Sequence, residues 1–149
     1  MVNKILSKNF NLNEFLESQT ATRKGYKEQY QPSDAVIDNL EQLVIKVLQP
    51  LRDLLPFGTM IISSGYRCSR LNTSVGGKPS SQHLTGMAAD ICYYEDGHKD
   101  NLKLYNTLIK SGLTFDQAIK EYGTETNPNS IHISYNSKGA NRKQKLTIT

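Results

Sequence analysis

The sequence has no tryptophan, two cysteines and no long apolar run. No segment approaches the roughly 20 apolar residues of a membrane span, so we expect no membrane partner. The N-terminus also lacks the apolar core of about 7–15 residues that marks a secretion signal. We therefore expect the chain to be cytoplasmic as synthesised, unless something else carries it out.

The two cysteines, Cys68 and Cys92, form no Cys-x-x-Cys pair and do not suggest a disulfide-dense scaffold. Cys92 lies in an apolar segment that is typical of a strand, so we expect it to be a small buried residue. A bridge between the two is possible in an oxidising setting, but two free thiols are the expectation.

Charge is modest: the net charge is +4 and the pI is about 9.0. This balance favours a polyanionic partner such as cell wall or nucleic acid. Basic and aromatic residues are not interleaved as in a nucleic-acid module, so we expect no nucleic-acid partner. The one basic run, residues 142–145, is expected to be a solvated tail.

The 149 residues predict a single domain, residues 1–149, that buries about two thirds of its unfolded surface. Asn11 and Glu14 form a capping-box pattern before a short helix that reaches Leu16. The polar stretch 18–32 is expected to be an irregular connector. Ser33 then caps the strongest amphipathic helix, which runs towards Leu55 and is kinked or locally ended by Pro50.

The second half of the chain alternates strands and loops. It predicts a strand over 60–64, a loop over 72–81, a strand leading through Ile91, a turn over 95–98 and a helix over 100–112. Residues 114–122 fit either a helix or a strand. Residues 131–135 alternate as a strand, with His132 and Ser134 on one face. The sum is a small α+β domain with helices on one side of a few strands.

Three residues are candidate metal ligands: His83, Asp90 and His132. Two imidazoles and a carboxylate suit Zn²⁺ and leave a fourth position for water, as in catalytic zinc sites. An unbroken helix would hold positions 83 and 90 roughly 10 Å apart, so the chain must bend between them, and Gly86 allows this. A surface histidine and a turn aspartate explain the same spacing, so spacing alone leaves both interpretations open.

The sequence motif around these residues resembles that of a known family. Ser81-x-His83-x-x-Gly86-x-Ala88-x-Asp90 resembles the signature of the zinc D-alanyl-D-alanine carboxypeptidases, whose relatives include the vancomycin-resistance D,D-dipeptidases and the L-alanyl-D-glutamate endopeptidases of phage endolysins. Further phrases in the same order resemble the phage-type branch: Ser18-x-Thr20-Ala21-x-Arg23-x-Gly25, Asn39-Leu40, Val47-Leu48-x-Pro50-Leu51-Arg52, Ser64-Gly65-Tyr66-Arg67, Leu71-Asn72, Val75-Gly76-Gly77, Phe115-Asp116-Gln117 and Ile131-His132-Ile133-Ser134.

The resemblance implies a Hedgehog/DD-peptidase-like fold, α+β with a small antiparallel sheet flanked by helices, and a strand for the ambiguous segment 114–122. It implies one Zn²⁺ per chain, held by His83, Asp90 and His132. It also implies that Arg67 acts as a bidentate clamp for a substrate carboxylate. The competing interpretation of Arg67 is a structural ion pair.

The general base departs from the family pattern. Relatives often place a carboxylate three residues before the last histidine, where this chain has Asn129. Glu121 is the substitute, since a hairpin of 115–122 with 131–135 brings it near His132. The alternatives are a solvated Glu121, and Asp116 as a weaker candidate base that is more typical of a structural acid.

Four other residues complete the candidate set. Ser81 and Gln82 either bind substrate or hold His83. Ser130 stands where the family commonly has tryptophan, and His98 lies in a turn and is expected to be exposed.

These expectations add up to a monomeric zinc peptidase that acts on bacterial peptidoglycan peptides after release from the cell. The resemblance to phage endolysins implies an endolysin-like role and a phage-encoded origin. The alternatives are a non-catalytic wall-binding or virion structural module on the same fold, and a zinc amidase that cuts the glycan–peptide link.

Overall fold

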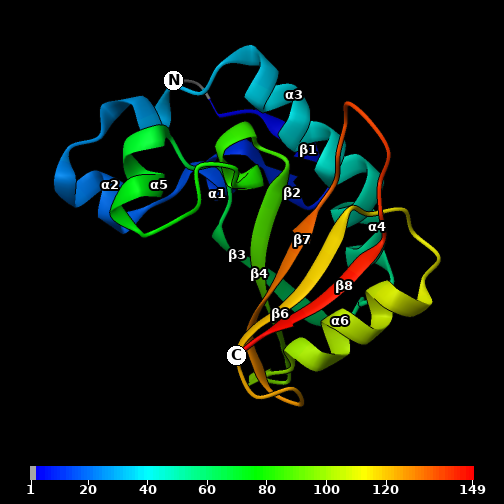
Figure 1. Ribbon diagram of the computed structural model, residues 1–149. Coiled ribbons are helices and arrows are strands. Elements are labelled where there is room, and N and C mark those ends of the chain that lie inside the picture. The colour runs from blue at the N-terminus through cyan, green and yellow to red at the C-terminus, as the bar shows by residue number, and fades with distance from the viewer. Residues whose placement is uncertain (1–2) are drawn as a thin grey trace.

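The structure is a computed structural model that describes residues 3–149. A six-stranded sheet has the order β3-β4-β7-β6-β8, with β5 paired to β4, and β1 and β2 form a separate ribbon (Figure 1). The strands are β1 (Ile5–Ser7), β2 (Phe10–Asn11), β3 (Gly58–Ser64), β4 (Ala88–Glu95), β5 (His98–Lys99), β6 (Gln117–Gly123), β7 (Pro128–Ser134) and β8 (Gln144–Ile148). The helices and helical turns are α1 (Leu12–Leu16), α2 (Gln19–Lys24), η1 (Lys27–Tyr30), α3 (Asp34–Leu43), η2 (Val44–Leu48), α4 (Gln49–Asp53), α5 (Ser69–Ser74), η3 (Gln82–Thr85) and α6 (Asn101–Lys110). The α+β expectation is confirmed.

The long amphipathic helix is built from α3, η2 and α4 in succession. Ser33 caps it, and its hydroxyl accepts from the Val36 amide at 3.2 Å. The π-helical turn η2 stands directly before Pro50, which occupies the first turn of α4. Because proline has no N–H and clashes with the preceding turn of an α-helix, the wider turn lets the helix continue through it.

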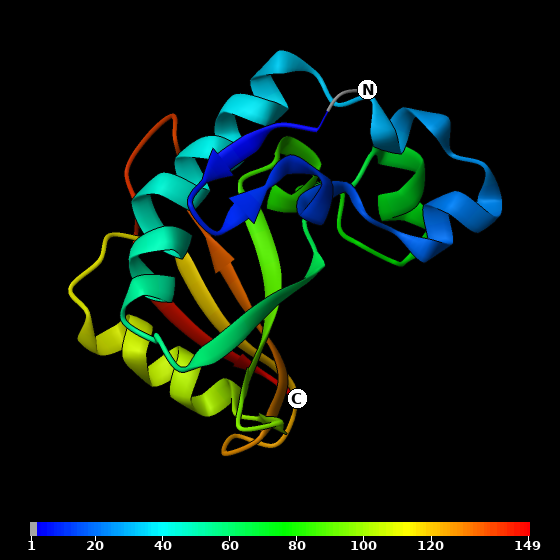
Figure 2. The ribbon, with the colours of Figure 1, turned by 180° about the vertical axis from the view of Figure 1, so that it is seen from behind.

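The sheet has one covered face and one open face. On β4, Ala89, Ile91 and Tyr93 are fully buried against the helices, and Ile131 and Ile133 of β7 share that side. Figure 2 shows the long helix and α6 in front of the sheet, whereas Figure 1 shows the opposite face without a helix over it. The alternate residues of these strands therefore lie on the open face, where the candidate site is found.

The C-terminal segment corrects two expectations. The basic run 142–145 is not a solvated tail: Arg142 bonds to buried Asp116, and Gln144 begins β8. Strand β8 pairs with β6 in parallel, so the sheet is mixed rather than purely antiparallel. The buried carboxylate of Asp116 needs a charged partner, and the backbone of β8 completes the ladder of β6.

Three local predictions change as well. The stretch 18–32 is largely helical, since it contains α2 and η1. The buried side chain of Gln29 holds η1 in place by bonding to Leu16 O, Tyr66 O and the Cys68 amide. Helix α5 extends into the expected loop 72–81 as far as Ser74. The ambiguous segment 114–122 contains strand β6, as the resemblance implied.

The cysteines are both free thiols. Cys68 is buried, but Cys92 is only partly buried because it points to the open face of β4 and not into the core, which corrects that expectation. Among residues 3–149, no helix is both long and apolar enough to cross a membrane.

Candidate metal centre and active site

His83 lies on the short turn η3, which follows the Ser81 cap. The Ser81 hydroxyl accepts from the His83 amide at 3.2 Å. Gly86 ends the turn with φ of +76°, and a Cβ at this position would meet Val36 O at 2.7 Å. The bend expected between His83 and Asp90 is therefore made at Gly86, the one residue type that fits both the backbone angle and the space.

A carbonyl fixes the imidazole of His83. Its Nδ1 lies 2.7 Å from Gly65 O, so Nδ1 carries the proton and donates it to that carbonyl. Nε2 is left with its lone pair and lies 3.3 Å from Asp90 Oδ1. A histidine held this way through its far nitrogen is oriented as metal-binding histidines are.

Asp90 and His132 meet through the register of the sheet. They are direct partners in the antiparallel pair of β4 and β7. His132 Nδ1 lies 2.9 Å from Asp90 Oδ1, and the His83 and His132 ring centroids are 5.1 Å apart. Burial opposes the ionisation of Asp90, but the hydrogen bond from His132, together with the close imidazole of His83, outweighs it and holds the pKa of Asp90 well below its usual range.

The three side chains form a group that is able to hold one metal ion. One ligand atom from each of His83, Asp90 and His132 lies within 4.8 Å of the others, and all three residues are at most 9% exposed. Two imidazole nitrogens and one carboxylate oxygen fit Zn²⁺ with a fourth position to spare. The donor set and the fixed ring of His83 thus fit the zinc that the sequence implied.

Glu121 lies on β6 beside this group. Its partner on β7 is Ser130, two residues before His132, so Glu121 and His132 project from the same open face. The Ser130 hydroxyl donates to Glu121 Oε1 at 3.3 Å. Burial, followed by the negative charge of Asp90, raises the pKa of Glu121 to about 7. A carboxyl group in such a place is suited to proton transfer near neutral pH.

Arg67 reaches the group from the end of β3. Its amide donates to His83 O at 3.0 Å, and its guanidinium lies 3.5 Å from Asp90 Oδ2. Two further contacts, to Ser64 Oγ and Asn72 Oδ1, are both 3.3 Å long. These contacts are at the long end of the hydrogen-bond range, so the guanidinium keeps donors for a ligand.

A cavity of about 440 Å³ opens beside Arg67, between the α1–α2 junction and the end of β3. This volume is within the range of small-ligand sites. Its lining combines polar and apolar surface: Glu17, Ser18, Gln19, Thr20, Ile62, Ser63, Ser64, Tyr66, Arg67, Leu71 and Val75. Apart from Arg67, the sequence indicated no function for these residues, although the matching phrase that begins at Ser18 was a signal.

Gln82 and Asp116 lie in a chain of polar contacts behind η3. Gln82 Nε2 donates to Asp116 Oδ2 at 2.9 Å, and Arg142 donates twice to the same carboxylate, at 2.9 and 2.8 Å. These bonds, chiefly those from Arg142, lower the pKa of Asp116 to about 2. Asp116 is therefore committed to structure, and sequence reasoning missed Arg142 because its partner is 26 residues away.

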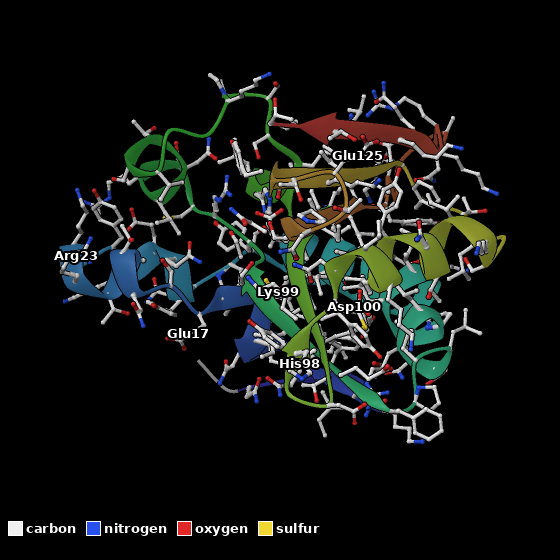
Figure 3. The ribbon with its side chains drawn as sticks, turned by 90° about the horizontal axis from the view of Figure 1, so that it is seen from below. Glu17, Arg23, His98, Lys99, Asp100 and Glu125 are labelled. Atoms are coloured by element: carbon white, nitrogen blue, oxygen red, sulfur yellow. The ribbon has the colours of Figure 1, made fainter. Side chains whose placement is uncertain are left out.

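His98 lies apart from the group. It is exposed on β5, where it pairs with Glu95 at the end of β4 far from Asp90. Figure 3 shows His98 and Lys99 side by side there, and Glu17 on a different part of the chain. Glu95 is five positions beyond Asp90 along β4, which is about 16 Å of strand. The expected exposure of His98 is confirmed.

A family model described as Peptidase M15 matches residues 8–134. The matched range includes the three candidate ligands, Arg67 and Glu121, and it ends before β8 begins. No curated protein matches the chain.

Proposed function

The chain belongs to the peptidase M15 family, whose members are zinc-dependent peptidases, and we propose that it hydrolyses peptide bonds in the stem peptides or cross-links of bacterial peptidoglycan. The observation that carries this proposal is the buried group of His83, Asp90 and His132, with Glu121 beside it on the helix-free face of the sheet.

In this proposal His83, Asp90 and His132 hold one zinc ion. When bound, zinc supplies a Lewis acid that lowers the pKa of water and polarises the scissile carbonyl. The donor set carries a single negative charge, so the dication keeps a net positive charge towards substrate. The contacts from Gly65 O to His83 and from Ser81 to the η3 turn hold the ligands in place before substrate arrives.

Glu121 is the proposed general base. Its carboxylate accepts a proton from the attacking water and then donates it to the nitrogen of the leaving amine. The hydroxyl of Ser130 orients the carboxylate from the neighbouring strand. Glu121 thereby fills the role that the amide of Asn129 cannot take.

Arg67 is the proposed anchor for substrate. Its guanidinium stands between the candidate ligand Asp90 and the polar cavity, and planar guanidinium groups bind carboxylates through two parallel bonds. A peptide whose carboxylate reaches Arg67 from the cavity places a nearby amide bond over the metal group. Ser81 and Gln82 support this arrangement by holding η3 and leave the direct substrate contact to Arg67.

The test is Glu121→Gln, with Glu125→Gln as the matched control. Glu125 is an exposed acid in the β6–β7 turn (Figure 3). Purified peptidoglycan is incubated with zinc-loaded protein, and new termini are identified by mass spectrometry. We expect Glu121→Gln to lower kcat by about 10²–10⁴-fold with zinc content unchanged, and Glu125→Gln to behave as the wild type.

Two results contradict the proposal. A wild-type chain that holds zinc but releases no termini favours a wall-binding or virion structural module, an alternative suggested by Asn129 and by Ser130 in place of tryptophan. New termini at the glycan–peptide link instead indicate an amidase. The endolysin-like role, in which a monomer reaches the wall after release, is supported by the resemblance to the phage-type branch alone.

A further inference from the structure

Strand β8 extends the open face of the sheet beyond the candidate active site. Leu146 is the partner of Ile119, which is itself the partner of His132. Ile148 is the partner of Glu121. A side-chain bond of 2.7 Å between Gln117 and Gln144 shows that the two strands present these positions to the same side.

The residues therefore form two rows across the strands. The first row runs from Ser64 on β3 through Asp90, His132 and Ile119 to Leu146 on β8. The second contains Ser130, Glu121 and Ile148. The candidate ligands and the candidate base are thus directly continuous with β8.

Strand β8 carries its apolar side chains on the open side of the sheet. Leu146 and Ile148 face that side and are 37% and 40% exposed, and Lys145 and Thr147, which alternate to the other side, are exposed as well. A half-buried strand normally turns its apolar residues to the core and its polar residues to water. Leu146 and Ile148 lie on the same side of β8, next to Ile119 and Glu121 of the candidate site, where apolar side chains suit contact with a ligand.

The spacing suits a peptide. Neighbouring strands lie about 4.8 Å apart, so Ile148 is about 5 Å from Glu121 and Leu146 is about 10 Å from His132, measured between backbones. An extended peptide rises about 3.3 Å per residue, so one to three residues span these gaps. Arg67 follows β3 at the opposite edge of the sheet, which gives the open face a cationic end and an apolar end.

We propose that Leu146 and Ile148 form an apolar wall that binds an uncharged, aliphatic residue of the peptide substrate, on the side of the scissile bond away from Arg67. This inference rests on the proposed function and adds to it the orientation and side-chain class of the substrate. The wall lies outside the residues that match the family model, which end at 134.

The test is the double variant Leu146→Thr, Ile148→Thr, because threonine keeps the β-propensity of the strand while removing apolar surface. Lys145→Thr is the matched control on the other side of β8. Soluble peptides released from purified peptidoglycan serve as substrates. We expect the double variant to raise KM at least fivefold with kcat within twofold of wild type and with zinc content unchanged. The control should leave KM unchanged.

A second measurement does not depend on turnover. Cosedimentation with insoluble peptidoglycan is compared for Glu121→Gln with and without the two threonine substitutions, and the wall predicts at least fivefold weaker binding with them. If the wild type cuts nothing but the Leu146 and Ile148 variants lose binding, the proposed hydrolysis is wrong and the proposed apolar contact is supported. Unchanged KM and unchanged binding in the double variant contradict the proposal that Leu146 and Ile148 bind substrate. The proposal is also contradicted if the wild type is a dimer and the double variant is a monomer with the same KM, because these side chains then contact a second copy of the chain.

Discussion

Single contacts decide where the candidate ligands point. The ring of His83 is held by Gly65 O through Nδ1, and the turn that carries it is closed by Gly86. Neither contact involves the metal-facing atoms, so the site depends on residues that never touch the ion. Changes at these residues should alter metal binding while every ligand stays present.

Gly86→Ala tests this dependence, with Gly97→Ala as its control. Both glycines have φ of +76°, so alanine is strained at each by about 1–2 kcal/mol. Only at Gly86 does the new Cβ also meet backbone, Val36 O at 2.7 Å, because Gly97 has nothing within 4 Å. We expect Gly86→Ala to lower the free energy of unfolding by at least 1 kcal/mol more than Gly97→Ala, and to reduce zinc content. Denaturant titration and elemental mass spectrometry measure the two effects, and equal losses in the two variants would contradict the steric argument.

At the scale of whole elements, one ion pair anchors the segment that leads into β8. The guanidinium of Arg142 donates two bonds to Asp116 and the Arg142 amide donates a third, and the other partner of Asp116 is Gln82 on η3. The C-terminal strand and the turn that carries His83 therefore share one buried carboxylate. Removal of Arg142 leaves that carboxylate without its charged partner.

The pH dependence of this pair has a definite sign. The pKa of Asp116 is lowered from 3.8 to about 2 in the folded chain, chiefly by Arg142, so the stabilisation is complete above about pH 4 and is lost as pH falls towards 2. We expect Arg142→Gln to cost about 1 kcal/mol at pH 6 and less near pH 2, because the guanidinium is partly exposed and the pKa shift also includes the bonds from Gln82 and from the Arg142 amide. Urea titrations across this range measure the difference. Lys143→Gln, one residue further along, should cost little at any pH, and a loss for Arg142→Gln that does not depend on pH would exclude the pairing as its cause.

The elements that could be predicted from sequence are those with local signals. The Asn11 and Ser33 caps and the alternation around His132 each depend on residues within a few positions. The helical turn η1 was missed because the side chain of Gln29 bonds to segments up to 39 residues away. Strand β8 was missed because its exposed residues show no core-facing alternation.

The candidate site also contains residues that could be predicted from sequence and residues that could not. His83, Asp90 and His132 could be grouped because their motif is local and because the strand pattern indicates on which face of the strand His132 lies. Arg142 could not be linked to the site, since the Asp116–Arg142 pair joins two elements far apart in the chain. Sequence patterns thus predicted the three residues that the structure brings together, but not the contacts from Arg142 that lie behind them.

For the molecule as a whole, the candidate metal group joins three separate parts of the chain. His83 comes from η3, Asp90 from β4 and His132 from β7, and all three side chains are buried. Figure 1 shows β4 and β7 side by side in the sheet. An ion bound by the folded chain stabilises it by mass action, because the unfolded chain does not hold the three ligands together.

Metal removal is therefore a test of the whole architecture. We expect about one zinc per chain, and at a free zinc concentration 100 times Kd a stabilisation of about 2.7 kcal/mol that chelator abolishes. His83→Ala and His132→Ala should lose both the zinc and the shift in Tm, whereas His98→Ala, which changes the exposed histidine of β5, should keep both. Elemental mass spectrometry and thermal unfolding with and without chelator provide the two measurements.

Two outcomes would contradict the prediction. Zinc that is retained in both ligand variants would place the ion elsewhere. A wild-type chain that binds no zinc after zinc is added back would indicate a binding module without the chemistry of its family.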